Sequence, residues 1–124
     1  YWGGLCAVWA ENLTRRALFD ALWARRTVAL TGCRIAVRFE VDGACMGSEI
    51  ACAEERHIRL RVWAPRALES IEILRDARPW HRTSAATNTL DLELTDRADK
   101  PSFYHARVTL ADGSLAVCSP VWVG

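Results

Sequence analysis

The sequence has few of the features that assign a function directly. Its 124 residues contain no hydrophobic run near the roughly 18 residues that a membrane span needs, and no basic-then-apolar leader before a small-residue cleavage site. Sixteen Lys and Arg residues against fifteen Asp and Glu leave a formal net charge of +1. Because no strong positive field would draw the chain to nucleic acid or to an anionic membrane, we expect neither as a partner.

Sequence motifs for catalysis and nucleotide binding are also missing. No serine lies in a G-x-S-x-G elbow, and the glycines form no phosphate-binding loop. The acidic pairs Glu54-Glu55 and Glu69/Glu72 are better explained as solvated surface charge than as acid and base. The only three histidines lack the spacing of a metal site: His57, His81 and His105. The sequence therefore predicts no catalytic, cofactor-binding or metal-ligating residue within this chain.

The cysteines are odd in number and show no C-x-x-C spacing, so at least one thiol is unpaired in a monomer. Cys45 and Cys52 could meet across a hairpin, but reduced cysteines acting as small core or rim residues are the simpler interpretation. This usage favours a reducing compartment and hence the cytoplasm. The five are Cys6, Cys33, Cys45, Cys52 and Cys118.

A helical pattern occupies the first thirty residues, and a strand pattern follows from a boundary near Thr31-Gly32. With Thr14 as N-cap, the spacing predicts one amphipathic helix over residues 14–26. Its apolar side chains sweep an arc of roughly 200°, well beyond the ~100° that a surface helix needs. We therefore predict a packing or interaction surface that includes the nearby tryptophans: Trp2, Trp9, Leu18, Phe19, Leu22 and Trp23.

From residue 35 onward, apolar residues alternate with polar ones, as in strands with one buried face. Asp42-Gly43 and Asp112-Gly113 mark tight turns, and Arg75–Pro79 is predicted to be a loop. The predicted strands lie near residues 35–41, 58–62, 71–74, 80–82, 90–94, 104–110, 115–118 and, as an edge strand, 121–123. With no second helix among them, the fold class is mainly β: an antiparallel immunoglobulin/fibronectin-like β-sandwich preceded by the helix.

Six tryptophans are the feature most open to a functional interpretation. Exposed indoles on a sandwich can stack on sugar rings, so an alternative function is an aromatic-surface module that binds carbohydrate through Trp63, Trp80 or Trp122. Their scattered positions favour structural packing where the helix meets the sheet.

Short motifs distributed over the whole chain, in order, carry a resemblance to a known family. The chain resembles the C-terminal region of a large bacterial family of unknown function that is related to the PHP (polymerase and histidinol phosphatase) metal-dependent phosphoesterases. The matching segments are 3–11, 13–15, 18–22, 25–27, 31–35, 47–50, 71–75, 104–108, 112–113 and 119–123.

The resemblance implies that residues 1–30 are the terminal loop and helix of a PHP-like barrel and that residues 31–124 form an appended β-sandwich. It implies that the parent protein is the enzyme, with divalent metal ligands upstream of the Gly3-Gly4-Leu5 segment. We therefore expect a non-catalytic accessory domain without a cofactor of its own. Its expected partners are the missing N-terminal barrel or, through the N-terminal helix, a second copy of the chain.

Overall fold

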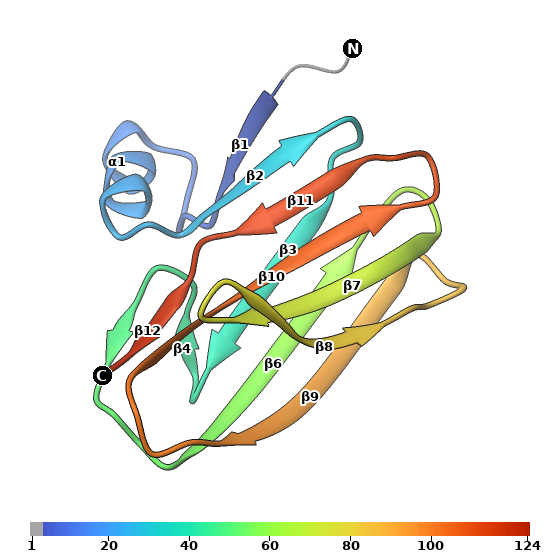
Figure 1. Ribbon diagram of the computed structural model, residues 1–124. Helices are drawn as coiled ribbons and strands as arrows, with labels where there is room; N and C mark the ends of the chain where they lie inside the picture. Colours follow the sequence, from blue (N-terminus) through green and yellow to red (C-terminus); the bar gives the residue numbers. More distant parts are fainter. Residues whose placement is uncertain (1–3) are drawn as a thin grey trace.

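The computed structural model describes residues 4–124 as two β-sheets packed face to face, with one helix at their side (Figure 1). The helix is α1 (Arg15–Trp23). The smaller sheet contains β3 (Ala36–Val41), β4 (Ala44–Cys45), β6 (Glu55–Trp63) and β9 (Thr89–Arg97). The larger sheet contains β1 (Gly4–Val8), β2 (Thr27–Thr31), β5 (Glu49–Ile50), β7 (Leu68–Arg75), β8 (Arg78–Thr83), β10 (Ser102–Leu110), β11 (Leu115–Cys118) and β12 (Val121–Val123).

The larger sheet has the strand order β1-β2-β11-β10-β12-β5, and β7 pairs with β10 and carries β8 on its other side. The smaller sheet has the order β4-β3-β6-β9. All pairings are antiparallel except the short parallel pair of β12 with β5. For residues 4–124, the mainly β, two-sheet sandwich with a single helix is therefore confirmed. The finer immunoglobulin-like or fibronectin-like comparison stays a prediction.

The core forms because alternate residues of facing strands turn inward between the two sheets. Val37 and Phe39 of β3 meet Leu60 of β6 in this layer, together with Val108 and Leu110 of β10, and each is almost completely buried. The period-two patterns that predicted these strands also predicted this buried face. On the outside of the smaller sheet, charged pairs replace the apolar ones.

Two hairpin turns have left-handed backbone at both central positions. At Asp42-Gly43 the φ angles are 50° and 78°, and at Asp76-Ala77 they are 53° and 65°. These values fit the two-residue turns that match the twist of paired strands. The predicted loop over Arg75–Pro79 is therefore wrong: β7 runs to Arg75, and β8 begins at Arg78 directly after the turn.

The N-terminal segment and the last strand both differ from the expected arrangement. Residues 1–30 were predicted to be a loop and a helix ahead of the sandwich, but besides the helix they contain β1 and β2, which extend the larger sheet, with β2 paired to β11. Val28 and Leu30 of β2 lie in the common core. Val121–Val123 is not an edge strand, because β12 lies between β10 and β5. The origin of residues 1–30 in a barrel stays a prediction.

Candidate functional site: the exposed helix and its surroundings

Helix α1 begins as the sequence predicts. The side-chain oxygen of Thr14 accepts a hydrogen bond from the backbone N–H of Ala17 at 3.1 Å, which satisfies one of the helix's unpaired donors. The helix ends at Trp23, three residues earlier than predicted. Arg25 adopts a left-handed φ of 61°, so the chain leaves the helical path there and continues toward β2.

The C-terminal end of α1 is fastened to the sandwich at Gly47. The Arg25 side chain donates from Nε to the Gly47 carbonyl oxygen at 3.0 Å, and the Gly47 N–H donates to the Pro120 carbonyl at 2.7 Å. The Arg25 guanidinium lies over the Trp122 ring, 5.1 Å from its centroid. Ala21 is the buried residue of the helix. These contacts fix the orientation of α1 and therefore decide which of its faces remains uncovered.

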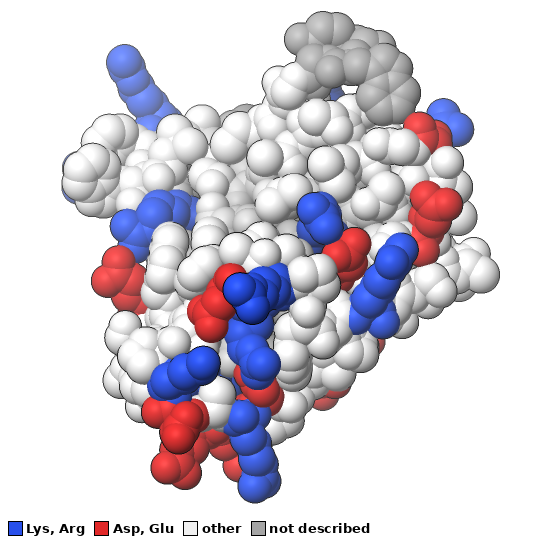
Figure 2. All heavy atoms as spheres, in the orientation of Figure 1, with Lys and Arg blue, Asp and Glu red and all other residues white. Residues whose placement is uncertain are grey.

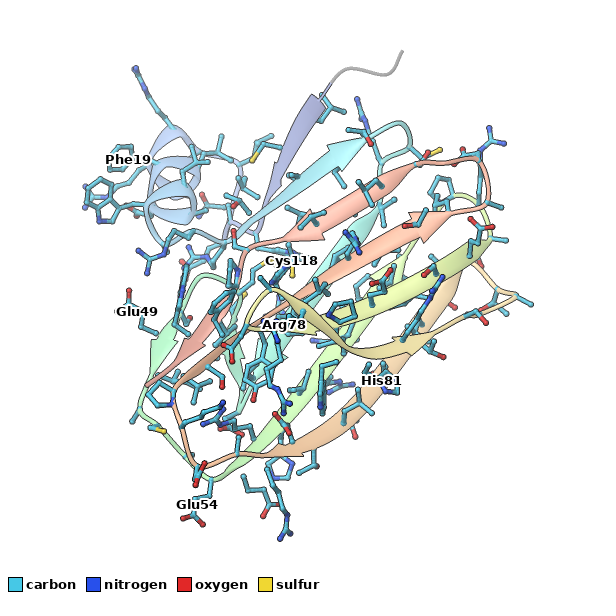
Figure 3. The ribbon with its side chains drawn as sticks, viewed as in Figure 1. Phe19, Glu49, Glu54, Arg78, His81 and Cys118 are labelled. Atoms are coloured by element: carbon cyan, nitrogen blue, oxygen red, sulfur yellow. The ribbon has the colours of Figure 1, made fainter. Side chains whose placement is uncertain are left out.

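The uncovered face carries large apolar side chains. Phe19, Leu22 and Trp23 expose 63%, 53% and 79% of their surface, and Leu13, just before the helix, exposes 90%. The rings of Phe19 and Trp23 stack on each other with centroids 6.3 Å apart and planes 13° from parallel. In Figure 3, Phe19 points away from the sandwich. We call this surface, Leu13 with Phe19, Leu22 and Trp23, the helix patch.

The remaining residues predicted for the interaction surface lie elsewhere. Leu18 is half-buried. Trp9 is also half-buried, and its indole Nε1–H donates to the Val37 carbonyl at 2.7 Å while the Arg38 guanidinium lies over its ring. Trp2 lies outside the described residues. Of the predicted residues, Phe19, Leu22 and Trp23 are thus exposed on α1, and their role in an interaction stays a prediction. Leu13 was not among the predicted residues, because it precedes the N-cap and so stands outside the helical period.

The three tryptophans of the carbohydrate-binding alternative do not share a face. Trp63 is an exposed residue of β6 in the smaller sheet, whereas Trp80 and Trp122 belong to β8 and β12 of the larger sheet. Trp80 packs with its ring edge-on to Tyr104, with centroids 6.3 Å apart, and Trp122 lies under Arg25. Both of these indoles are half-buried.

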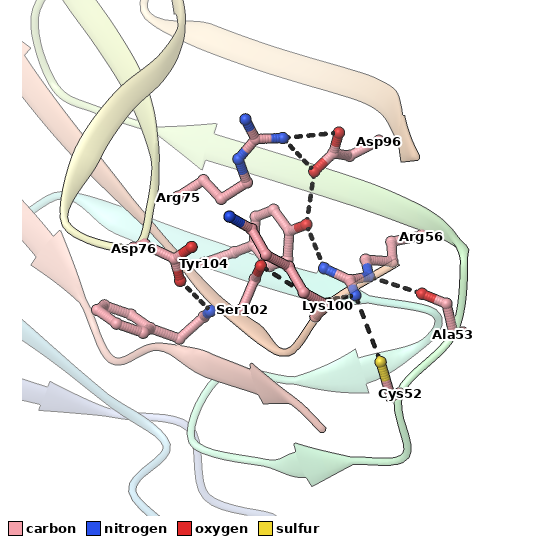
Figure 4. A network of polar contacts seen from close by, with 10 residues as sticks. Cys52, Ala53, Arg56, Arg75, Asp76, Asp96, Lys100, Ser102 and Tyr104 are labelled. Atoms are coloured by element: carbon pink, nitrogen blue, oxygen red, sulfur yellow. Dashed lines mark hydrogen bonds and ion pairs between the residues drawn. The ribbon is translucent and has the colours of Figure 1, made fainter. Parts of the chain in front are cut away.

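A second cluster of functional groups lies between the sheets (Figure 4). The Tyr104 hydroxyl donates to Asp96 at 2.6 Å and accepts from Arg56 at 2.9 Å. Arg75 donates to both Asp96 oxygens, at 3.0 and 2.9 Å. Arg56 is fully buried and also donates to the Ala53 carbonyl at 2.8 Å. We call Arg56, Arg75, Asp96 and Tyr104 the polar relay.

The ionisation of the polar relay follows from these contacts. Burial by itself would raise the pKa of Asp96, but the hydrogen bonds from Tyr104 and Arg75 outweigh it and leave the pKa lowered. Burial, with the hydrogen bond to Asp96, raises the pKa of Tyr104. Asp96 is therefore the ionised member and Tyr104 the neutral donor. Because each group has a partner, the arrangement ties β6, β7, β9 and β10 together.

The strand patterns contained a signal for the polar relay. Arg56 has the same parity as Ile58 and Leu60 on β6, and Asp96 has the same parity as Leu94 on β9. A charged residue at an inward position of each paired strand predicts buried polar contacts between the sheets. The ion pair of Asp96 nevertheless forms with Arg75, and Arg56 is linked to Asp96 through the Tyr104 hydroxyl, which the pattern of β6 and β9 alone does not show.

Thiols and imidazoles do not gather into a site in the part of the chain that is described. No group of three or more His, Cys, Asp or Glu residues within 4–124 is arranged to hold a metal ion. All five cysteines are free, so the pairing of Cys45 with Cys52 is absent.

Burial raises the pKa of the Cys118 thiol to about 12, and its sulfur accepts from the Ala106 N–H at 3.1 Å. Burial, with the nearby Arg107, lowers the pKa of His105.

The distribution of charge separates two parts of the surface. Figure 2 shows few charged side chains over β1, β2 and β11, whereas charged side chains of both signs gather in the lower part of the same face. Within residues 4–124, no helix is long and apolar enough to cross a membrane.

Comparisons with known proteins show that this chain is similar to one region of longer sequences. Residues 2–51 match the model of a family described as "Protein of unknown function (DUF3604)". An uncharacterized protein of Chlamydia pneumoniae is 34% identical over 142 aligned positions, and one of Chlamydia muridarum is 33% identical. Each alignment covers 99% of this chain and 23% of the relative. No solved structure matches the chain. Along nearly its whole length, the chain is thus similar to one region of longer uncharacterized proteins.

Proposed function

We propose that this chain is a non-catalytic accessory domain of a longer PHP-like metal-dependent hydrolase, and that it packs against the rest of that protein through the helix patch. The observation that carries the proposal is the exposure of Phe19, Leu22 and Trp23 on one short helix whose end is fixed to the sandwich. The resemblance described above supports a hydrolase as the parent. The length of the relatives, of which the chain spans 23%, supports a further part for the patch to meet.

The energetic argument concerns apolar surface. Burying exposed apolar area stabilises a contact by about 25 cal/mol per Å². Large aromatic side chains that cluster on a surface, instead of being scattered singly, mark interaction sites. The stacked rings of Phe19 and Trp23, with Leu22 beside them, form such a cluster. Within residues 4–124, these three side chains remain exposed on the helix.

The divalent metal implied for the parent does not fit this chain. Within residues 4–124 the His, Cys, Asp and Glu side chains do not converge as a metal site requires, so we derive no step through a metal. The proposed role of the chain is to stabilise the barrel by covering it. A contact between two copies through the same helix is the competing arrangement, and the experiment below separates the two.

The test uses the 124-residue chain and the remainder of its reading frame, expressed separately and mixed. Phe19→Ser with Trp23→Ser should weaken their association at least tenfold by calorimetry, because the two rings supply most of the patch. Arg15→Ser with Arg16→Ser is the matched control: it changes the same helix at exposed charged positions and should leave the affinity within twofold.

Three results would contradict the proposal. Equal binding by the Phe19/Trp23 variant would remove the helix patch from the contact. Absence of binding by the unmodified chain would remove the contact altogether. A dimer of the 124-residue chain that is lost in the Phe19/Trp23 variant, seen by light scattering over a range of concentrations, would establish the competing self-association.

A further inference from the structure

We propose that the free edge of β1 is a docking site for one more β-strand, supplied by the part of the longer protein outside these 124 residues. This inference rests on the proposed function, since it names a second surface, separate from the helix patch, at which the two parts would meet. It adds main-chain hydrogen bonding to a contact that the helix patch alone would make through side chains.

Backbone hydrogen bonds show which groups of β1 point to the free edge. The Trp9 N–H donates to the Arg26 carbonyl at 2.9 Å, and the Ser119 N–H donates to the Thr27 carbonyl at 3.0 Å. Because bonded positions alternate along an antiparallel strand, even-numbered residues of β2 bond β1 and odd-numbered ones bond β11. The N–H and C=O groups of Ala7 and Leu5 therefore face β2. Those of Gly4, Cys6 and Val8 face outward.

The inner side of this edge is largely apolar and open, although Arg34 also lines it. A groove of about 480 Å³ lies between β1 and the start of β3, and its walls include Val28, Leu30, Ile35 and Val37. Leu5 has the inward parity of the core residues, yet 42% of its surface is exposed. An inward-facing leucine remains exposed here because no strand lies beyond β1 among residues 4–124. A strand added beside β1 would place alternate apolar side chains against Leu5.

Other sheet edges in the described structure are protected in the usual ways. The outer strand β8 contains Arg78, Pro79 and Arg82, and β9 carries charges at alternate positions such as Asp91 and Glu93. Charged residues, proline and short length all discourage pairing with another strand. By contrast, β1 has the sequence Gly-Leu-Cys-Ala-Val, without charge or proline. A run that is apolar on both faces is typical of a strand with neighbours on both sides and cover on both faces.

Trp9 limits the docking site to β1. Its indole donates to the Val37 carbonyl, which lies on the edge of β3 that faces away from β6. This carbonyl of the β3 edge therefore already has a hydrogen-bond partner. Trp9 also lines the groove. An incoming strand would therefore lie alongside Gly4–Val8 and end near Trp9. The longer protein is the favoured source, because 77% of each relative, the remainder after 23%, lies outside the matched region.

Amide hydrogen exchange tests this pairing. In the 124-residue chain, the amides of Cys6 and Val8, which face the free edge, should exchange rapidly. The amides of Ala7 and Trp9, which face β2, should exchange slowly. In the product of the complete reading frame, exchange at Cys6 and Val8 should slow at least tenfold, because both amides gain partners. Unchanged rates at these two positions would overturn the inference.

A proline variant provides the second test. Cys6→Pro removes an N–H that makes no bond to β2, so the 124-residue chain should keep its fold, but its affinity for the separately expressed remainder should fall at least tenfold. Cys6→Ser keeps the N–H and is the matched control, with affinity expected within twofold. If Cys6→Pro unfolds the chain, the exchange comparison on the unmodified protein still decides.

The outcomes separate this inference from the proposed function. If Trp23 becomes shielded from acrylamide quenching in the complete protein while Cys6 and Val8 still exchange rapidly, the helix patch docks and the edge pairing is wrong. If Cys6 and Val8 are protected while Trp23 stays accessible, the edge pairing holds and the helix contact is wrong. Protection in the 124-residue chain that rises with concentration would assign the edge to a second copy and overturn the inference.

Discussion

The indole Nε1–H of Trp9 donates a hydrogen bond of 2.7 Å to the main-chain oxygen of Val37, which joins the two sheets at their open end. Trp9→Phe keeps most of the apolar contact but leaves this carbonyl without its donor. We expect the free energy of unfolding to fall by about 1–2 kcal/mol, the usual cost of a lost hydrogen bond at a partly buried group. Urea titration followed by far-UV circular dichroism measures the change, and a loss near zero would mean that water replaces the indole.

The attachment of α1 depends on the absence of a side chain at Gly47. A Cβ atom there would lie 2.4 Å from the carbonyl oxygens of both Ala24 and Arg25. Gly47→Ala should therefore destabilise the protein by more than the roughly 1 kcal/mol expected for left-handed backbone strain alone, and should release the end of the helix.

Gly43→Ala is the matched control for Gly47→Ala. Gly43 also has a left-handed φ, 78° against 91°, but beyond its own chain neighbours no atom lies within 4 Å of the position of an added Cβ. Differential scanning calorimetry of the two variants should give the larger fall in Tm for Gly47→Ala. Equal falls would show that strain, and not the close approach to the helix, accounts for the effect.

How far the sequence predicts this structure depends on the kind of interaction. The strands β3, β6, β9 and β10 follow from alternation, because each buries one face and exposes the other. The strands β1 and β2 were missed, since Gly4–Val8 is apolar on both faces and shows no period of two. β5 contains only two residues and pairs with a strand more than seventy positions away, which no local pattern records.

The candidate site shows the same limit. Thr14 and the apolar spacing predict α1 and three residues of the helix patch. They do not predict which face the sandwich covers, because that depends on Gly47 and Trp122, which are distant in the sequence and contact Arg25 just after the helix. The helical spacing identifies which residues of α1 lie on its apolar side. Contacts with residues distant in the sequence determine which of these side chains remain exposed.

The Tyr104 hydroxyl gives a direct test of the polar relay. Tyr104→Phe retains the ring in the core but removes a donor to Asp96 and an acceptor for the fully buried Arg56. We expect a loss of about 1–3 kcal/mol in the free energy of unfolding, since buried charged groups lose a partner. In a double-mutant cycle with Asp96→Asn, the two losses should be non-additive because they concern one network. Additive losses would show that the two groups act independently.

Acid unfolding should report the ionised state of Asp96. Its pKa is lowered in the folded protein by the hydrogen bonds from Tyr104 and Arg75, which outweigh burial, whereas in the unfolded chain it has the ordinary value of 3.8. A lowered folded-state pKa gives stability that is fully present above the unfolded pKa and is lost as the pH falls through the folded one. The stability difference between the unmodified protein and Asp96→Asn should therefore be constant from pH 7 to about 5 and shrink below about 4.

Asp91→Asn is the matched control for this pH dependence. Asp91 also pairs with an arginine, Arg59, at 3.0 Å, but both side chains are substantially exposed, so the contact is screened by solvent. Its substitution should change stability little at any pH, whereas Asp96→Asn should change it substantially at neutral pH. Urea unfolding at a series of pH values between 2 and 7 provides the measurement. A stability difference for Asp96→Asn that does not vary with pH would mean that the carboxylate's charge contributes nothing to the polar relay.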